Sequence, residues 1–398
     1  MSNRLNAGER KEEGRFSLVV GGPFNSAMTR LGLTAADQLP THRAAIGLAM
    51  LAWLVPAMFV ILQSVFDSHY SGWSYFTDSM AYTRYLIAIL VLIATERYAD
   101  SRTLMLVDQF RDARIVSDDS LSGFTSALDA ADRRSSSRIA ELSILTAAIV
   151  WSTITAQFSV EHLGSSWMGA QADNQVVLSW AGEAARLFSN SLFLFLVMRW
   201  IWRFFVWAML LYRISQLPLQ LTPQNSDRAA GLGFLSIYPS VFTGLVFAMS
   251  CVVASAFLHE LDITQYQPSA VWFALALWLV IILILFIGPL LVFYPMLYRV
   301  REQALLDYGS LTNQHHLAFN HKWVDEENNG ADMVGTTDPS TATDLNACMQ
   351  AVRDMHLIPV DFPAVMQLVI AAGLPMLTVV VREVPLTEIL KWFLGVIF

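Results

Sequence analysis

Long apolar blocks alternate with polar segments along most of the chain. A membrane-spanning helix needs about 20 consecutive apolar residues, and most of the blocks reach that length. Seven such blocks occur, at residues 44–66, 80–95, 139–158, 187–212, 234–257, 271–298 and 364–381. The pattern predicts an all-α fold, a polytopic transmembrane helical bundle of about seven spans.

Two of the polar segments predict helices that continue outside the membrane. The block at 80–95 is short for a span, but apolar residues keep a helical period through Phe110, and residues 118–138 predict a second helix. The block at 271–298 is also predicted to continue as a helix, to about Val324. We therefore expect the bundle to carry helical extensions on one side.

The segments that follow predict a loop and a short helix. Residues 325–342 are rich in turn formers and predict a loop, whereas residues 343–356 predict a helix. The cytoplasmic loops expected from these limits are residues 97–138, 213–233 and 299–363.

The last apolar stretch, residues 384–398, is interrupted by two charged residues. Its amphipathic pattern predicts a segment that lies flat in the membrane interface. A re-entrant hairpin with the block at 364–381 is the alternative, because Gly373 and Pro375 interrupt that block.

Composition narrows the class of protein. Hydrophobic residues make up 55% of the 398 residues and charged residues 15%, whereas soluble domains carry about 25% charged residues. The mean hydropathy of +0.47 also excludes a disordered chain. Residues 1–43 are polar and lack the apolar core of a signal peptide, so we expect a cytoplasmic N-terminal tail ahead of a transmembrane domain at 44–398.

Lysine and arginine alternate between the two sides. The tail and the segment 97–138 are rich in them, whereas residues 159–185 and 257–270 contain none. Cytoplasmic loops carry the excess of basic residues, so the N-terminus is predicted to be cytoplasmic. Arginine far outnumbers lysine, a bias typical of GC-rich bacterial genomes, and we therefore expect a bacterial inner (plasma) membrane.

Two arginines inside the fourth block are the candidate site. Arg199 and Arg203 lie four residues apart and so share a helix face. An arginine at membrane depth costs at least about 2.5 kcal/mol unless it faces protein or water, so a partner is expected. Glu96 and Glu141 are the predicted partners. The group is either an anion-binding, lipid-headgroup or pore-lining site, or a structural set of ion pairs.

The segment before the fifth block is a candidate anion site. The amides near Gly231 and Gly233 lie where a helix is expected to begin, a position that favours anions, and Arg228 adds positive charge. The alternative is a turn capped by a residue of the Asn225–Asp227 run.

Other chemistry has little support. The segments expected outside the cell carry acidic residues and one histidine each, His69, His162 and His259, but without metal-ligand spacing. We predict no metal and no cofactor. Motifs of common enzymes are lacking, so we expect no catalytic residue, although a membrane enzyme acting on lipid stays open. The net charge of −8 argues against nucleic-acid binding.

Four stretches of the chain resemble an uncharacterised family of bacterial multi-pass inner-membrane proteins. They are residues 199–235, 308–324, 338–398 and, more weakly, 95–116. Asn225-Ser226-Asp227 stands where the family usually has His-Pro-Asp. The resemblance implies the same membrane architecture and brings no activity, substrate or catalytic residue.

The sequence favours two functions over a membrane enzyme. The first is a channel- or transporter-like protein whose polar interior surrounds the arginines of the fourth block. The alternative is a non-transporting membrane scaffold or sensor that binds a partner through its cytoplasmic helices. The expected partners are the lipid bilayer and either a second copy of the chain or a cytoplasmic protein, and any substrate stays open.

Overall fold

The computed structural model describes most of the chain and confirms the helical bundle. The described residues are 17–19, 21–30, 40–67, 72–161, 167–172, 175–263, 268–325 and 338–383. Seven helices in this part of the chain are long and apolar enough to cross a membrane. The protein is therefore a multi-pass α-helical membrane protein, as the apolar blocks predicted.

Each predicted span corresponds to a helix or to a run of consecutive helices. In chain order the spans consist of α3 (His42–Phe66); α4 (Ser79–Ala81), η2 (Tyr82–Ala88), α5 (Ile89–Ala94) and α6 (Glu96–Asp112); α8 (Arg138–Glu161); α9 (Trp180–Ala184), η4 (Ala185–Asn190) and α10 (Ser191–Ser215); η5 (Gly233–Phe242) and α11 (Thr243–Ile263); α12 (Pro268–Ile287), η6 (Gly288–Phe293) and α13 (Tyr294–Asn320), which η7 (His321–Asp325) extends; and α15 (Phe362–Glu383).

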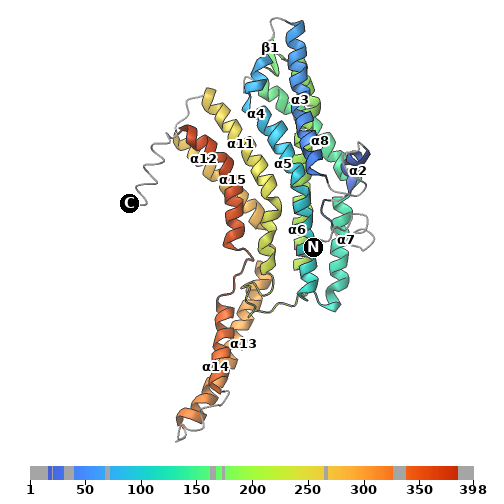
Figure 1. Cartoon of the computed structure of the whole chain (residues 1–398). Helices are drawn as coiled ribbons and strands as arrows, with labels where there is room; N and C mark the ends of the chain where they lie inside the picture. Colours follow the sequence, from blue (N-terminus) through green and yellow to red (C-terminus); the bar gives the residue numbers. More distant parts are fainter. Residues whose placement is uncertain are drawn as a thin grey trace.

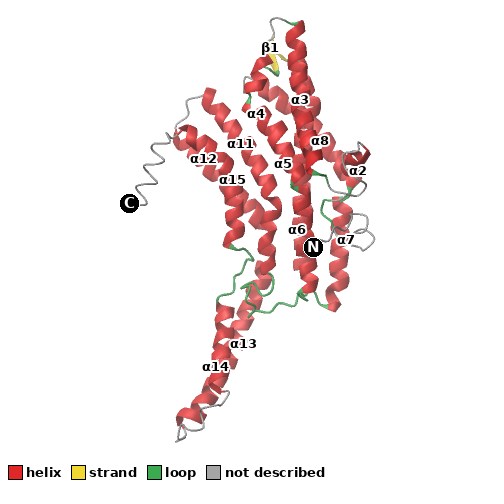
Figure 2. Ribbon diagram, viewed as in Figure 1, coloured by secondary structure: helices red, strands yellow, loops and turns green. Residues whose placement is uncertain are grey.

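Shorter elements lie outside the spans. They are α2 (Gly22–Arg30), η1 (Gly72–Thr77), η3 (Asp118–Ser120), α7 (Leu121–Ser135), the strands β1 (Gly169–Ala172) and β2 (Gln175–Leu178), and α14 (Asp338–Arg353). The strands pair in antiparallel register, with Gly169 opposite Leu178. Figure 2 shows how small this hairpin is beside the helices.

The helices form two neighbouring groups. In Figure 1, α11, α12 and α15 lie on one side, and α3, α5, α6 and α8 lie on the other. Within the first group α11 packs along α15, and in the second α10 packs on α7 and α8. The groups meet where α11 contacts η2 and α5. Close approach there depends on Gly244, whose α-carbon faces the side chain of Thr95.

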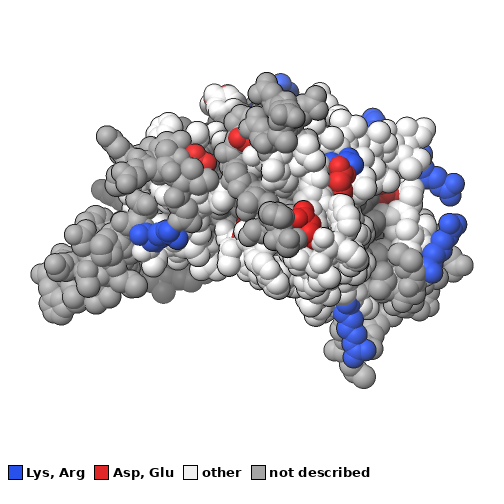
Figure 3. Space-filling view, turned by 90° about the horizontal axis from the view of Figure 1, so that it is seen from above, with Lys and Arg blue, Asp and Glu red and all other residues white. Residues whose placement is uncertain are grey.

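The two ends of the bundle differ. At one end α13 and α14 project together beyond the other helices, and the β-hairpin lies at the opposite end (Figure 1). Seen from the hairpin end, the described surface is mostly uncharged, and most of its basic side chains lie toward the rim (Figure 3).

Aromatic and polar contacts close the hairpin end. The indole Nε1 of Trp167 donates to Asp78 Oδ2 at 2.7 Å, and the hydroxyl of Tyr75 donates to the carbonyl oxygen of Trp53 at 2.6 Å. Burial raises the pKa of Tyr75 well above its ordinary value. The hydroxyl therefore stays protonated and keeps its donor role over the physiological pH range.

The structure corrects several predicted limits. Residues 338–342, predicted as loop, form the first turn of α14; Pro339 suits that position because its fixed φ matches a helix and its missing N–H would be unpaired there anyway. The fifth span begins with a 3-10 helix instead of an α-helix, with Pro239 inside it. Residues 1–43 were predicted as a polar tail, with no helix predicted in it, but they contain helix α2. The C-terminal segment 384–398 falls outside the described residues.

Candidate functional site

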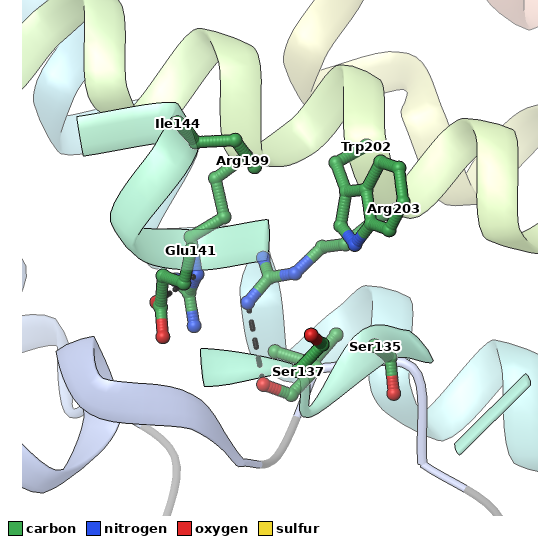
Figure 4. Close-up of a pocket in the computed structure, with 8 residues that line it drawn as sticks. Ser135, Ser137, Glu141, Ile144, Arg199, Trp202 and Arg203 are labelled. Carbon is green, nitrogen blue, oxygen red and sulfur yellow. Dashed lines mark hydrogen bonds and ion pairs between the residues drawn. The ribbon is translucent and has the colours of Figure 1, made fainter. Parts of the chain in front are cut away.

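The arginines of the fourth span lie in the interior of the bundle. Arg199 and Arg203 are one turn apart on α10, and their side chains are only 7% and 3% exposed. Figure 4 shows Arg199 beside Glu141 and the guanidinium of Arg203 pointing toward the junction of α7 and α8. At membrane depth such charges require acidic partners, and the structure supplies two.

Glu96 is shared by both arginines. Its Oε1 accepts a hydrogen bond from Arg199 Nη1 at 2.7 Å and another from Arg203 Nη1 at 3.0 Å. The helix is interrupted at Thr95, and Glu96 begins α6. The amide dipoles of a first turn favour a negative charge, so the local structure also stabilises this carboxylate.

Glu141 is the second acidic partner. Its Oε1 lies 3.3 Å from Arg199 Nε, and its Oε2 accepts a hydrogen bond from the backbone N–H of Phe24 at 3.2 Å. The structure thus brings together the four residues that the sequence singled out, Glu96, Glu141, Arg199 and Arg203. We call them the buried charge cluster.

The N-terminal segment completes this cluster, which the sequence analysis did not anticipate. The carbonyl oxygen of Val19 accepts from Arg203 Nη2 at 3.3 Å, and the ring of Phe24 lies 4.7 Å from the guanidinium carbon of Arg199. Gly22 has a φ of +86°, a backbone conformation that glycine adopts without strain. The described part of the predicted tail is therefore packed against the bundle.

Asp100 is a further buried carboxylate that the sequence analysis missed. It lies one turn after Glu96 on α6 and accepts a hydrogen bond from the hydroxyl of Ser17. Both carboxylates and the hydroxyl of Thr103 are almost fully buried. The sequence could have indicated this polar face. Glu96, Asp100 and Thr103 are spaced by four and then three residues, which places their side chains on one face of a helix.

The charge cluster leaves little space for a ligand. The cavity beside the arginines, lined also by Ser135 and Ser137, has a volume of about 10 Å³. A single water molecule needs about 10–15 Å³ of such space, so the cavity holds one water at most. The arrangement can join α6, α8, α10 and the N-terminal segment, but the cavity is too small for a substrate.

The candidate anion site is already filled by a side chain of the same turn. The carboxylate of Asp227 accepts hydrogen bonds from the amides of Ala229, Gly231 and Gly233, at 2.9, 3.1 and 2.8 Å. Arg228 has a φ of +56°, and its carbonyl oxygen accepts from the amide of His356. The predicted anion site is therefore corrected to a capped turn, because the Asp227 carboxylate already accepts the hydrogen bonds that an external anion would need.

Removing that carboxylate is expected to destabilise the turn. Asp227→Ala leaves three partly buried amides without their acceptor, and we expect a loss of about 1–3 kcal/mol in the free energy of unfolding. Thermal unfolding of the purified protein in detergent measures it. Gln224→Ala, an exposed change in the same loop, should stay within about 0.5 kcal/mol of the parent. Equal stability of the two variants would contradict the role given to Asp227.

Within the described ranges, no three side chains of His, Cys, Asp or Glu gather in a metal-binding arrangement; His69 and His162 fall outside those ranges.

No family model, curated protein or solved structure matches the chain. The resemblance to the inner-membrane family stays a prediction, and the class of the protein rests on its fold.

Proposed function

We propose that the protein is a non-transporting membrane scaffold or sensor that binds a protein partner through α13 and α14. The observation that carries this proposal is the helical hairpin that these two helices form beyond the bundle (Figure 1). At about 1.5 Å per residue, a helix as long as α13 (27 residues) extends about 40 Å. Most of this length lies beyond the bundle, where α13 can contact another molecule (Figure 1).

The outer face of α13 carries exposed apolar side chains, separated by exposed polar residues such as Ser310 and Asn313. Leu306, Leu317 and Val324 are 70%, 61% and 69% exposed. Val324 lies in η7, beyond the end of α13, whereas Leu306 and Leu317 lie 11 residues apart on α13, close to three helical turns, and share one face. We call them the α13 stripe. Apolar residues scattered singly are common on protein surfaces, but two that share one face of a projecting helix suit a partner whose apolar side chains cover them.

The charges beside the stripe suggest the chemistry of the partner. Glu302 and Asp307 are exposed on α13 near Leu306. An amphipathic helix that lays its apolar face along the stripe and carries basic residues at its edge satisfies both features. The partner proposed is therefore a basic amphipathic helix of a cytoplasmic protein.

The basic residues support a cytoplasmic position for the projecting helices. Helices α6 and α7, whose sequences contain arginines, lie in the half of the bundle from which α13 and α14 project (Figure 1). The positive-inside rule supports a cytoplasmic position for that end, and hence for the hairpin. With the arginine-rich composition, this favours a bacterial inner membrane and a cytoplasmic N-terminus.

The channel or transporter hypothesis has less support. It required Arg199 and Arg203 to face a polar, hydrated interior. Both guanidinium groups instead contact Glu96, and Arg199 also contacts Glu141, beside a cavity with room for one water at most. These contacts support a structural role for the arginines, as ion pairs between helices.

Site-specific photocrosslinking in cells tests the scaffold proposal. A photoreactive residue at Leu306 or Leu317 should give one discrete crosslinked product, whose peptides identify a cytoplasmic protein with an amphipathic helix. The same residue at Leu311, which is exposed on a different side of α13, should not give this product. Products that are independent of position, or that contain only a second copy of this chain, would contradict the proposal. So would solute flux in liposomes that Arg199→Ala abolishes.

A further inference from the structure

A groove lies on the flank of the bundle where α2 crosses α8 and α10. Its volume is about 340 Å³, within the range of about 300–1,000 Å³ that is typical of small-molecule sites. Helix α2 contributes Phe24 and Ala27 to the wall, and α8 contributes Leu142, Leu145 and Ile149. The third wall is the junction of η4 and α10.

The lining of this groove is almost entirely apolar. Glu141 and Ser191 are its polar members, and Glu141 already contacts Arg199 and the amide of Phe24. Leu142 and Leu187 are both more than half exposed, although they belong to helices that are candidate membrane spans. The surface that surrounds the groove therefore faces the bilayer, where the available apolar molecules are acyl chains.

A basic residue marks one end of the same surface. Arg138, Leu142, Leu145 and Ile149 follow each other at intervals of four, three and four residues, so they share one face of α8. Arg138 is the first residue of α8 and is exposed, whereas the leucines and the isoleucine lie progressively deeper in the span. A molecule with an anionic head and an apolar tail matches this order.

We propose that the groove between α2, α8 and α10 binds one acyl chain of an anionic glycerophospholipid whose phosphate pairs with Arg138. The acyl chain runs from the level of Phe24 toward Leu187, and the headgroup stays at the end of the span. Helix α2 turns an otherwise convex helix surface into a concave one. Its position is held by the hydrogen bond from the Phe24 amide to Glu141.

Photolabelling of the full chain in vesicles tests this site. The vesicles contain phosphatidylcholine and phosphatidylglycerol, with a trace of phosphatidylglycerol that carries a photoreactive group on its acyl chain. We expect peptides that cover residues 138–149 and 187–195 to be labelled well above peptides of α12, which also faces the bilayer. Labelling spread evenly over α8 and α12 would show ordinary surrounding lipid only and would overturn the proposal.

Two groove-filling variants on different helices separate loss of the site from misfolding. Leu145→Trp on α8 and Ala27→Phe on α2 should each remove the excess labelling. The matched change Leu277→Trp, at an exposed position of α12, should leave it unchanged. Excess labelling that survives in both groove variants would show that the lipid binds elsewhere.

Arg138→Gln tests the headgroup contact. One basic residue near an anionic surface contributes about 1 kcal/mol, so we expect labelling by the phosphatidylglycerol probe to fall about fivefold. Labelling by a phosphatidylcholine probe with the same acyl chain should not change. Equal labelling by both probes, with or without Arg138, would overturn the choice of an anionic lipid.

Discussion

Glu96→Ala is expected to lower the free energy of unfolding by about 3–5 kcal/mol, because it removes the shared acceptor of two buried cations. Arg199 Nη1 and Arg203 Nη1 both donate to Glu96 Oε1, and all three side chains are nearly inaccessible to solvent. The arginines would remain in the bundle at the same depth, where Arg199 would keep its contact with Glu141 and Arg203 its hydrogen bond to the carbonyl oxygen of Val19. Thermal unfolding in detergent and the yield of folded protein measure the effect.

Two further variants show whether burial of charge is the cause. Glu183→Ala removes a partly exposed ion pair with Arg186, which lies three residues later in the same span, and should cost about 0–1 kcal/mol. A quadruple variant replaces Glu96, Arg199 and Arg203 by methionine and Glu141 by glutamine, which keeps an acceptor for the Phe24 amide. Removing one partner of a buried ion pair destabilises a protein more than replacing the whole pair with apolar residues. This variant should therefore be more stable than Glu96→Ala. Equal instability of both would show that the packing of these side chains matters more than their charge.

Gly244→Ala is expected to destabilise the contact between the two helix groups. A methyl group at this position would lie less than 3.0 Å from three atoms of the Thr95 side chain, so α11 would have to move away from the junction of α5 and α6. Overpacking of this kind costs about 1–3 kcal/mol. The measurement is again thermal unfolding in detergent, with the melting temperature compared with that of the parent protein.

A glycine in another span provides the matched control. Gly373 lies inside α15, and a methyl group there would meet no atom within 4 Å. Alanine forms helix better than glycine by about 1 kcal/mol, so Gly373→Ala should be neutral or stabilising. If Thr95→Ala restores the stability of Gly244→Ala, the close approach of these two residues is established as the cause. If both glycine variants behave alike, the close approach does not limit stability.

The sequence alone predicted the seven spans and the residues of the charge cluster. The spans were predictable because each depends on a local run of apolar residues, which the bilayer requires at a nearly constant length. Glu96 and Glu141 were predictable as partners because a buried arginine needs a carboxylate, and few carboxylates lie near the spans. Which arginine each would contact was not predictable, since helix rotation decides it: Glu96 contacts both, and Glu141 contacts Arg199.

Other features were decided by the tertiary structure. The packing of residues 17–30 against the charge cluster depends on contacts between segments more than 80 residues apart, such as Ser17 with Asp100 and Val19 with Arg203. The groove beside α8 exists because α2 lies there, and a local pattern cannot show where a short helix will dock. Runs of apolar residues therefore determined the membrane architecture. The geometry of each site was set instead by contacts between side chains and backbone groups that are distant in the sequence.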